Sequence, residues 1–238
     1  MSETKDWLNE LVLTMARLRA ADGCPWDREQ THQSLKRYLV EESAELLDAI
    51  DDGDDDRLAD ELGDVLLQVA FHAQIAAEAE RFDLQDVARR LCAKLIRRHP
   101  HVFGDAEVND AAGVVVKWEE IKKTERDDEP ESVLGDIPKH LPALAQAEKI
   151  QRRAAKVGFD WAELKDLLPK LREELAELEQ ALDTAAAKAA AAEIGDLLFT
   201  VVNVARFIDV DPEDALRRTN RKFRRRFAYV EDRVRSGD

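Results

Sequence analysis

Two groups of acidic residues in this 238-residue chain repeat one another at the same spacing. The first follows the pattern E-E-x-x-E and, further on, E-x-x-D; its members are Glu41, Glu42, Glu45, Glu61 and Asp64. The second copies the first at a constant displacement of 132 in the numbering, and its members are Glu173, Glu174, Glu177, Glu193 and Asp196. Acids three or four residues apart share one face of a helix, so two facing helices would gather four or five carboxylates around one point.

Three of these acids stand where a helix would normally place a leucine. Glu42 lies three residues after Leu39 and four before Leu46, and Glu61 and Glu174 occupy equivalent positions in their own apolar stripes. A buried carboxylate without a partner costs several kcal/mol, so these positions need a cation. An oxygen-only group without His or Cys favours Mg²⁺, or Mn²⁺ as a substitute, over zinc. A single E-x-x-E is commonly a solvated helix face, but the stripe positions and the repetition favour a metal site.

The elements that must position these acids are helices. Apolar residues recur at helical spacing on both sides of residues 51–56, where Gly53 is a signal for a helix end and Asp54 for a helix start. This pattern predicts two helices that meet at a tight turn. No segment shows convincing strand alternation; residues 113–116 are the only candidate, and they run into a helical pattern. The sequence therefore predicts an all-α fold.

Features outside the acidic groups repeat as well. Trp26-Asp27 is matched by Phe159-Asp160, at a displacement of 133. Cations one helical turn apart, suited to binding phosphates, recur at a displacement of 128: Lys94 and Arg98, then Lys222 and Arg226. A period this long indicates a domain duplication.

The segment between the two copies has the composition of a linker, because it is highly charged and carries three prolines. We therefore predict two tandem helical-bundle repeats, each with a carboxylate-lined metal site. The first repeat would span residues 1–124, the linker residues 125–142, and the second repeat residues 143–238.

The overall composition excludes several classes of protein. The chain carries 36 Lys and Arg against 51 Asp and Glu, a formal net charge of −15, so we expect no stable nucleic-acid binding. The longest uncharged stretch, Val65 to Ala77, is shorter than the roughly 20 residues of a membrane span, and no signal peptide is evident. Cys24 and Cys92 form no metal-binding spacing and suit a reducing compartment. We expect a cytoplasmic protein without membrane association.

One aromatic residue could contact a base. Trp118 lies four residues before Lys122, which would set a base-stacking ring beside a phosphate-binding cation.

Several short motifs occur here in the order found in one known family. They are Cys24–Asp27, Arg97–Phe103, Val157–Trp161 and Asn220–Phe227, together with the two acidic groups. In these motifs the chain resembles MazG, a family of tandem-repeat nucleoside triphosphate pyrophosphohydrolases in the all-α superfamily that also contains the dimeric dUTPases. The resemblance covers nearly the whole chain. It implies Mg²⁺-dependent cleavage of nucleoside or deoxynucleoside triphosphates to the monophosphate and pyrophosphate, housekeeping of the nucleotide pool, and a homodimer.

The resemblance also implies roles for individual residues. The ten acids named above would be the metal ligands, and Lys222 and Arg226 would bind the triphosphate. The family often has a Lys four residues before the E-x-x-D glutamate. That position is Arg57 in the first repeat and Ala189 in the second, with Lys188 beside it. We predict that Arg57 and Lys188 bind the substrate. This difference favours the first repeat as the stronger catalytic site.

One glutamate of each E-E pair, Glu41 or Glu173, adjoins the ligand face without lying in the apolar stripe, which suits a general base. The cations would hold the triphosphate and stabilise the pyrophosphate that leaves. An alternative from another class stays open: a non-catalytic helical binding or regulatory protein that Mg²⁺ merely stabilises. Release of pyrophosphate from a triphosphate distinguishes the two.

Overall fold

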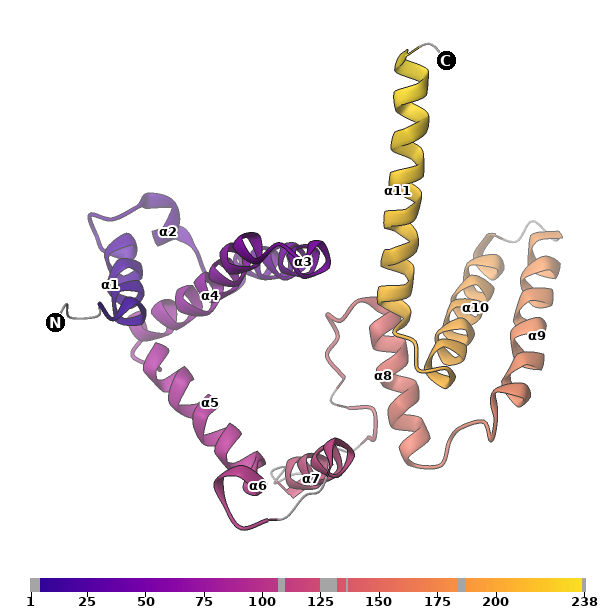
Figure 1. Cartoon of the computed structure of the whole chain (residues 1–238), viewed down its shortest axis with the longest axis horizontal. Helices are drawn as coiled ribbons and strands as arrows, with labels where there is room; N and C mark the ends of the chain where they lie inside the picture. The colour runs from indigo at the N-terminus through magenta and orange to yellow at the C-terminus, as the bar shows by residue number, and fades with distance from the viewer. Residues whose placement is uncertain (1–4, 107–109, 125–131, 136, 184–186, 237–238) are drawn as a thin grey trace. The chain divides into compact units, whose positions relative to one another are not determined.

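The computed structural model describes residues 5–106, 110–124, 132–135, 137–183 and 187–236. The chain divides into two compact units, Met1–Arg126 and Asp127–Asp238. Every regular element among the described residues is a helix, which confirms the all-α prediction (Figure 1). None of these helices combines the length and the apolar character that a membrane span needs.

The first unit contains seven helices among its described residues. They are α1 (Trp7–Arg19), α2 (Pro25–Glu29), α3 (Lys36–Asp52), α4 (Asp55–Glu78), α5 (Leu84–Arg98), α6 (Pro100–Phe103) and α7 (Ala111–Thr124). Helices α3 and α4 pack against each other, and α1 packs against α4. The turn between α3 and α4 is the predicted one. Gly53 adopts a left-handed φ of 68°, and the Asp54 side chain caps α4 by accepting from the amides of Asp56 and Arg57 at 3.1 Å.

The core of the first unit lies where α1, α3 and α4 meet. Met15, Leu35, Ala70 and Phe71 are buried there. Trp26 packs its ring edge-on against Phe71, with the ring centroids 6.5 Å apart. This packing fixes α4 relative to α1 and holds the N-terminal half of α4 alongside α3.

The second unit repeats this arrangement with four helices among its described residues. They are α8 (Ala143–Lys156), α9 (Leu164–Asp183), α10 (Ala187–Phe207) and α11 (Pro212–Ser236). Helix α10 packs against both α9 and α8, as α4 packs against α3 and α1. Leu167 and Val202 are fully buried in this unit. The duplication predicted from the spacing of the acids is therefore present in the helix packing.

Large apolar side chains remain exposed on both units. Leu39 and Ile50 belong to the apolar face of α3, yet both are exposed. Residues 218–236 of α11 are exposed throughout, and Phe223 and Phe227 stack on each other along that helix. Figure 1 shows α11 extending past the other helices of its unit. Exposed apolar surface on this scale is typical of protein–protein contacts.

Candidate metal and active site

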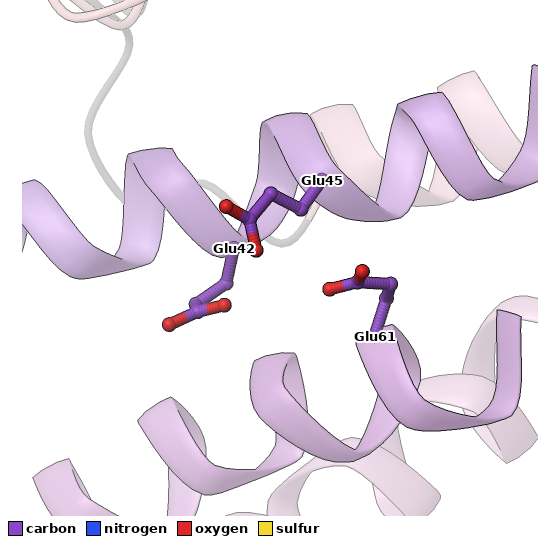
Figure 2. A group of neighbouring side chains, drawn as sticks. All are labelled: Glu42, Glu45 and Glu61. Carbon is purple, nitrogen blue, oxygen red and sulfur yellow. The ribbon is translucent and has the colours of Figure 1, made fainter. Parts of the chain in front are cut away.

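The first acidic group comes together at the facing surfaces of α3 and α4. Glu42 and Glu45 lie one turn apart on α3, and Glu61 faces them from α4 (Figure 2). One carboxylate oxygen from each lies within 4.8 Å of the others. The Gly53–Asp54 turn produces this meeting, because it folds α4 back along α3.

The surroundings of Glu42 disfavour its charged form, and a bound cation would favour that form. Glu42 is half-buried, and burial raises its pKa above the ordinary glutamate value. The neighbouring acids Asp64, Glu45, Glu61 and Glu41 raise this pKa further, in that order of effect. The fold therefore holds four acids close enough to Glu42 to disfavour its charged form.

The geometry fits a small divalent ion. Oxygens that share one Mg²⁺ ion at about 2.1 Å lie at most about 4.2 Å apart. A group whose oxygens already lie within 4.8 Å needs only small side-chain adjustments to reach that arrangement. The donors are all carboxylate oxygens, the ligands that hard divalent cations prefer.

Arg57 is the cation beside the first group. Its Nε lies 3.6 Å from Glu61 Oε1, and its guanidinium also pairs with Asp52 at the end of α3. The Arg57 side chain is partly exposed and pairs with Glu61, so it balances the charge at one edge of the group, while Glu42 and Glu45 lie side by side on α3 (Figure 2).

The second acidic group has the same construction with one addition. Glu174 and Glu177 on α9 meet Glu193 on α10, again with oxygens within 4.8 Å of one another. Glu174 is the most deeply placed of these acids, at 5% exposure. Burial and the charge of Glu174 raise the pKa of Glu177, while Lys170 acts in the opposite direction.

Lys170 is the residue that the sequence analysis missed. Its Nζ lies 2.8 Å from a carboxylate oxygen of Glu173 and 2.8 Å from one of Glu174, and these two bonds raise the pKa of the lysine. The signal was present in the sequence, since Lys170 precedes the pair by three and four residues and so shares its helix face. By the displacement that relates the two acidic groups, the equivalent position in the first repeat is Tyr38.

The remaining predicted acids border these groups. Glu41 and Glu173 lie on the exposed side of their helices, next to the more buried member of each pair. Asp64 is close enough to Glu42 to raise its pKa, and Asp196 follows Glu193 by one turn of α10.

Two of the predicted phosphate-binding cations of the first repeat lie on a different helix from the acids. Lys94 and Arg98 belong to α5, where Lys94 lines a cavity of about 660 Å³ together with Arg90 and Arg97. The Arg98 guanidinium lies over the Trp118 ring, 5.2 Å from its centroid. The side chain of Lys122 lies outside the described residues. Trp118 is therefore partly covered by a cation of its own unit.

The cations of the second repeat are arranged in the same way. Lys222 and Arg226 lie on the exposed helix α11, where Lys222 lines a shallow hollow with other basic residues of that helix. Lys188 is exposed in the first turn of α10, five residues before Glu193, and so faces away from it. Within one chain, the acids of each repeat thus lie on one helix pair and most of the predicted phosphate ligands on another helix.

Comparison with known proteins agrees with this construction. The profile of the MazG nucleotide pyrophosphohydrolase domain matches the chain twice, at residues 30–103 and 162–230, and each match contains one acidic group. The nucleoside triphosphate pyrophosphohydrolase/pyrophosphatase MazG of Thermotoga maritima is 49% identical over 98% of this chain and 89% of its own length. The nucleoside triphosphate pyrophosphohydrolase of Escherichia coli K12 is 46% identical over 94% of this chain and 87% of its own length.

A third relative carries a similar sequence within a longer protein. The uncharacterized protein YabN of Bacillus subtilis is 50% identical over 90% of this chain, which corresponds to 44% of YabN. The two domain matches and the long, closely similar relatives confirm the resemblance seen in the motifs. The chain belongs to the MazG nucleotide pyrophosphohydrolase family and carries the family's domain twice.

Proposed function

We propose that this chain hydrolyses nucleoside and deoxynucleoside triphosphates to the monophosphate and pyrophosphate, with Mg²⁺ or Mn²⁺ as its metal, in housekeeping of the cytoplasmic nucleotide pool. The observation that carries the proposal is the pair of acidic groups, each placing three carboxylates within 4.8 Å of one another on facing helices. Membership of the MazG family and the names of the close relatives support the same activity.

The acids would hold the metal. In the first repeat Glu42, Glu45 and Glu61 are the central ligands, with Asp64 and Glu41 at the border. In the second the central ligands are Glu174, Glu177 and Glu193, bordered by Asp196 and Glu173. A bound Mg²⁺ ion supplies charge neutralisation for the triphosphate and a lowered pKa for a coordinated water.

The other side chains would bind the substrate and move its proton. Glu41 or Glu173, exposed beside the ligands, accepts the proton of the water that attacks phosphorus. The bond between the α and β phosphates breaks, and pyrophosphate leaves with the electron pair. Cations would stabilise the charge that develops on it: Arg57, Lys94 and Arg98 in the first repeat, and Lys222 and Arg226 in the second.

A direct assay distinguishes this function from its rival, a helical binding or regulatory protein that Mg²⁺ only stabilises. Purified chain with ATP or dCTP and excess Mg²⁺ is expected to release one pyrophosphate and one nucleoside monophosphate per turnover, measured by anion-exchange chromatography. Release of inorganic phosphate and a nucleoside diphosphate instead would contradict the assignment of the cleaved bond. Metal-dependent melting without any product would favour the rival.

We also propose that the chain works as a homodimer. Within one chain, the acids and the cations on α5 or α11 lie on different helices, and α11 carries a stacked pair of exposed phenylalanines. A second copy that covers these helices would bury the apolar surface and could complete each site with cations of the other subunit.

Light scattering tests the dimer. At micromolar concentration the mass is expected to be twice 27.0 kDa. Replacement of Phe223 and Phe227 by Asp is expected to shift the mass toward one chain, because two charges would then lie in the covered surface. The matched control replaces Asn9 and Thr14, exposed on α1, by Asp and tests for a general effect of added charge. A monomeric wild type would contradict the proposal.

A further inference from the structure

Two histidines of the first unit form a stacked pair between the segment that precedes α3 and the C-terminal half of α4. The ring centroids of His32 and His72 lie 5.0 Å apart, and their planes are 12° apart. The two Nδ1 atoms are 2.8 Å apart, which is a hydrogen-bond distance. Both residues are half-buried. The pair therefore joins the chain that enters α3 directly to α4.

Arg81 determines which nitrogen of each ring carries a proton. Its guanidinium lies 2.8 Å from His32 Nε2, and a guanidinium can only donate. His32 Nε2 must therefore accept, so the proton of this neutral ring lies on Nδ1 and is donated to His72 Nδ1. His72 accepts at Nδ1 and carries its own proton on Nε2. The three side chains thus form a hydrogen-bonded chain in which both rings are neutral.

The end of α4 holds Arg81 in place for this contact. Glu80 adopts a left-handed φ of 53°, and the Arg81 amide donates to the Ala76 carbonyl at 3.0 Å. A guanidinium keeps its charge throughout the range in which histidine titrates. A fixed positive charge therefore lies beside His32, where it opposes both a second proton and a metal ion at the pair.

Protonation of either ring removes one of the two hydrogen bonds. A proton on His32 Nε2 would face the donor of Arg81, and a proton on His72 Nδ1 would face the Nδ1–H of His32. Burial lowers the pKa of His72 below the ordinary histidine value, and His32 lowers it further. The folded arrangement therefore disfavours the charged form of the pair.

Charged and titratable groups of the elements packed around this end of α4 have partners of their own. Glu78 of α4 accepts from Arg19 of α1 at 2.8 and 2.7 Å. Asp83, at the start of α5, accepts from the amide of Asp86, and the Tyr38 hydroxyl of α3 accepts from the preceding arginine. A charge taken up by the histidine pair is thus left facing the guanidinium of the hydrogen-bonded chain.

The pair lies at the open end of the α3–α4 hairpin. The Gly53 turn closes the other end, and the acids of the first group lie between the two. Glu42 follows His32 by ten residues, and Glu61 precedes His72 by eleven. The histidine pair therefore fixes the segment that begins α3 against the helix that carries Glu61.

We propose that His32 and His72 form a proton-sensitive clasp, which holds the open end of this hairpin when both rings are neutral and releases it when either is protonated. The opened state then binds more protons than the closed state, so closure is favoured as the pH rises. The contribution of the clasp is complete above the ordinary histidine pKa of about 6.5 and is lost as the pH falls below it. For one proton, the ratio of closed to open hairpin falls by up to roughly tenfold per pH unit.

The second repeat provides an internal control. By the displacement that relates the two acidic groups, the positions equivalent to His32 and His72 are Leu164 and Val204, which cannot take up a proton. Both repeats carry an acidic group, so titration of the acids affects both. The clasp does not depend on the proposed function. If that function holds, acid would loosen the first metal site and leave the second formed.

Amide hydrogen exchange of the full chain, without metal or substrate, tests the clasp. Between about pH 7.5 and 5.5, and after correction for the intrinsic exchange rate, peptides from the start of α3 are expected to open at least about tenfold more readily. Peptides from the start of α9 are expected to change less than about twofold. An equal response of the two helices would overturn the proposal, and the outcome is independent of pyrophosphate release.

Variants assign the response to the pair. His32→Leu combined with His72→Val copies the second repeat and is expected to remove the difference between the two helices. His72→Asn keeps an acceptor for the Nδ1–H of His32, so it protects the fold while it removes one titrating ring, and it is expected to reduce the response at least threefold. His140→Leu, at an exposed position of the second unit, is the matched control and should respond like wild type.

Proton NMR supplies a readout that a merely structural contact would not change. The ring signal of His72, identified by its absence in His72→Asn, is expected to titrate below the ordinary histidine pKa. A pKa of His72 at or above the ordinary value would overturn the clasp. So would a pH response that persists unchanged in both variants of the pair.

Discussion

Removal of divalent metal is expected to abolish pyrophosphate release, with a loss of at least a thousandfold in turnover. The acidic groups repel a triphosphate, and Glu42 is already disfavoured in its charged form by burial and by its acidic neighbours. Metal ions typically supply several kcal/mol of transition-state stabilisation, and each step of about 1.4 kcal/mol is tenfold in rate. The measurement is product release in excess EDTA.

Restoring the metal provides the control for this prediction. Mg²⁺ or Mn²⁺ added beyond the chelator should recover full activity and should also raise the melting temperature, because the folded acidic groups bind the ion and the unfolded chain does not. At a metal concentration roughly one hundred times the dissociation constant, the gain is about 2.7 kcal/mol per site. Undiminished activity in excess EDTA would rule out a metal mechanism.

Replacement of the central acids in both repeats is expected to reduce turnover as much as removal of the metal does. The variant combines Glu42→Gln and Glu61→Gln with the equivalent pair Glu174→Gln and Glu193→Gln. Glutamine keeps the shape of each side chain and removes the charge that holds the ion, so the helices should remain while the metal sites are lost. Turnover and helical circular dichroism measure the two effects separately.

The two double substitutions, made separately, show how much of the turnover comes from each repeat. Each pair alone is expected to leave only the turnover of the other repeat, so their residual rates should add up to roughly that of the wild type. The matched control, Asp48→Asn with Asp60→Asn, neutralises exposed acids on α3 and α4 and should retain full activity. Wild-type turnover in the fourfold variant would show that the acidic groups are not the catalytic centre.

Much of this architecture was predictable because it depends on local sequence rules. The α3–α4 turn follows from a glycine that tolerates positive φ and an aspartate that caps the next helix, both evident at Gly53 and Asp54. The partial burial of Glu42 and the full burial of Glu174 follow from their places in apolar stripes. Helical spacing also sufficed to bring each E-x-x-E pair to one face.

Other features depend on tertiary packing and escaped the sequence analysis. Leu39 and Ile50 satisfy the same stripe rule as buried residues, yet they remain exposed, because periodicity identifies an apolar face without saying whether its own chain covers it. A cavity of about 470 Å³ in the second unit, lined by Gln151, Trp161 and Phe199, depends on what α8 and α10 leave open between them. Neither residue spacing nor composition carries that information.

Lys170 has a consequence for the response to metal concentration. In each repeat an ion would compete with a cation that already pairs with an acid of the group. The Lys170 ammonium contacts Glu173 and Glu174 in the second repeat, whereas in the first repeat, where Tyr38 stands at the equivalent position, the Arg57 guanidinium contacts Glu61. Two sites of unequal affinity saturate one after the other, so occupancy rises over a wider range of free metal than two equal sites would allow. The duplication would therefore give one chain a graded metal response, because different cations compete with the ion at its two sites.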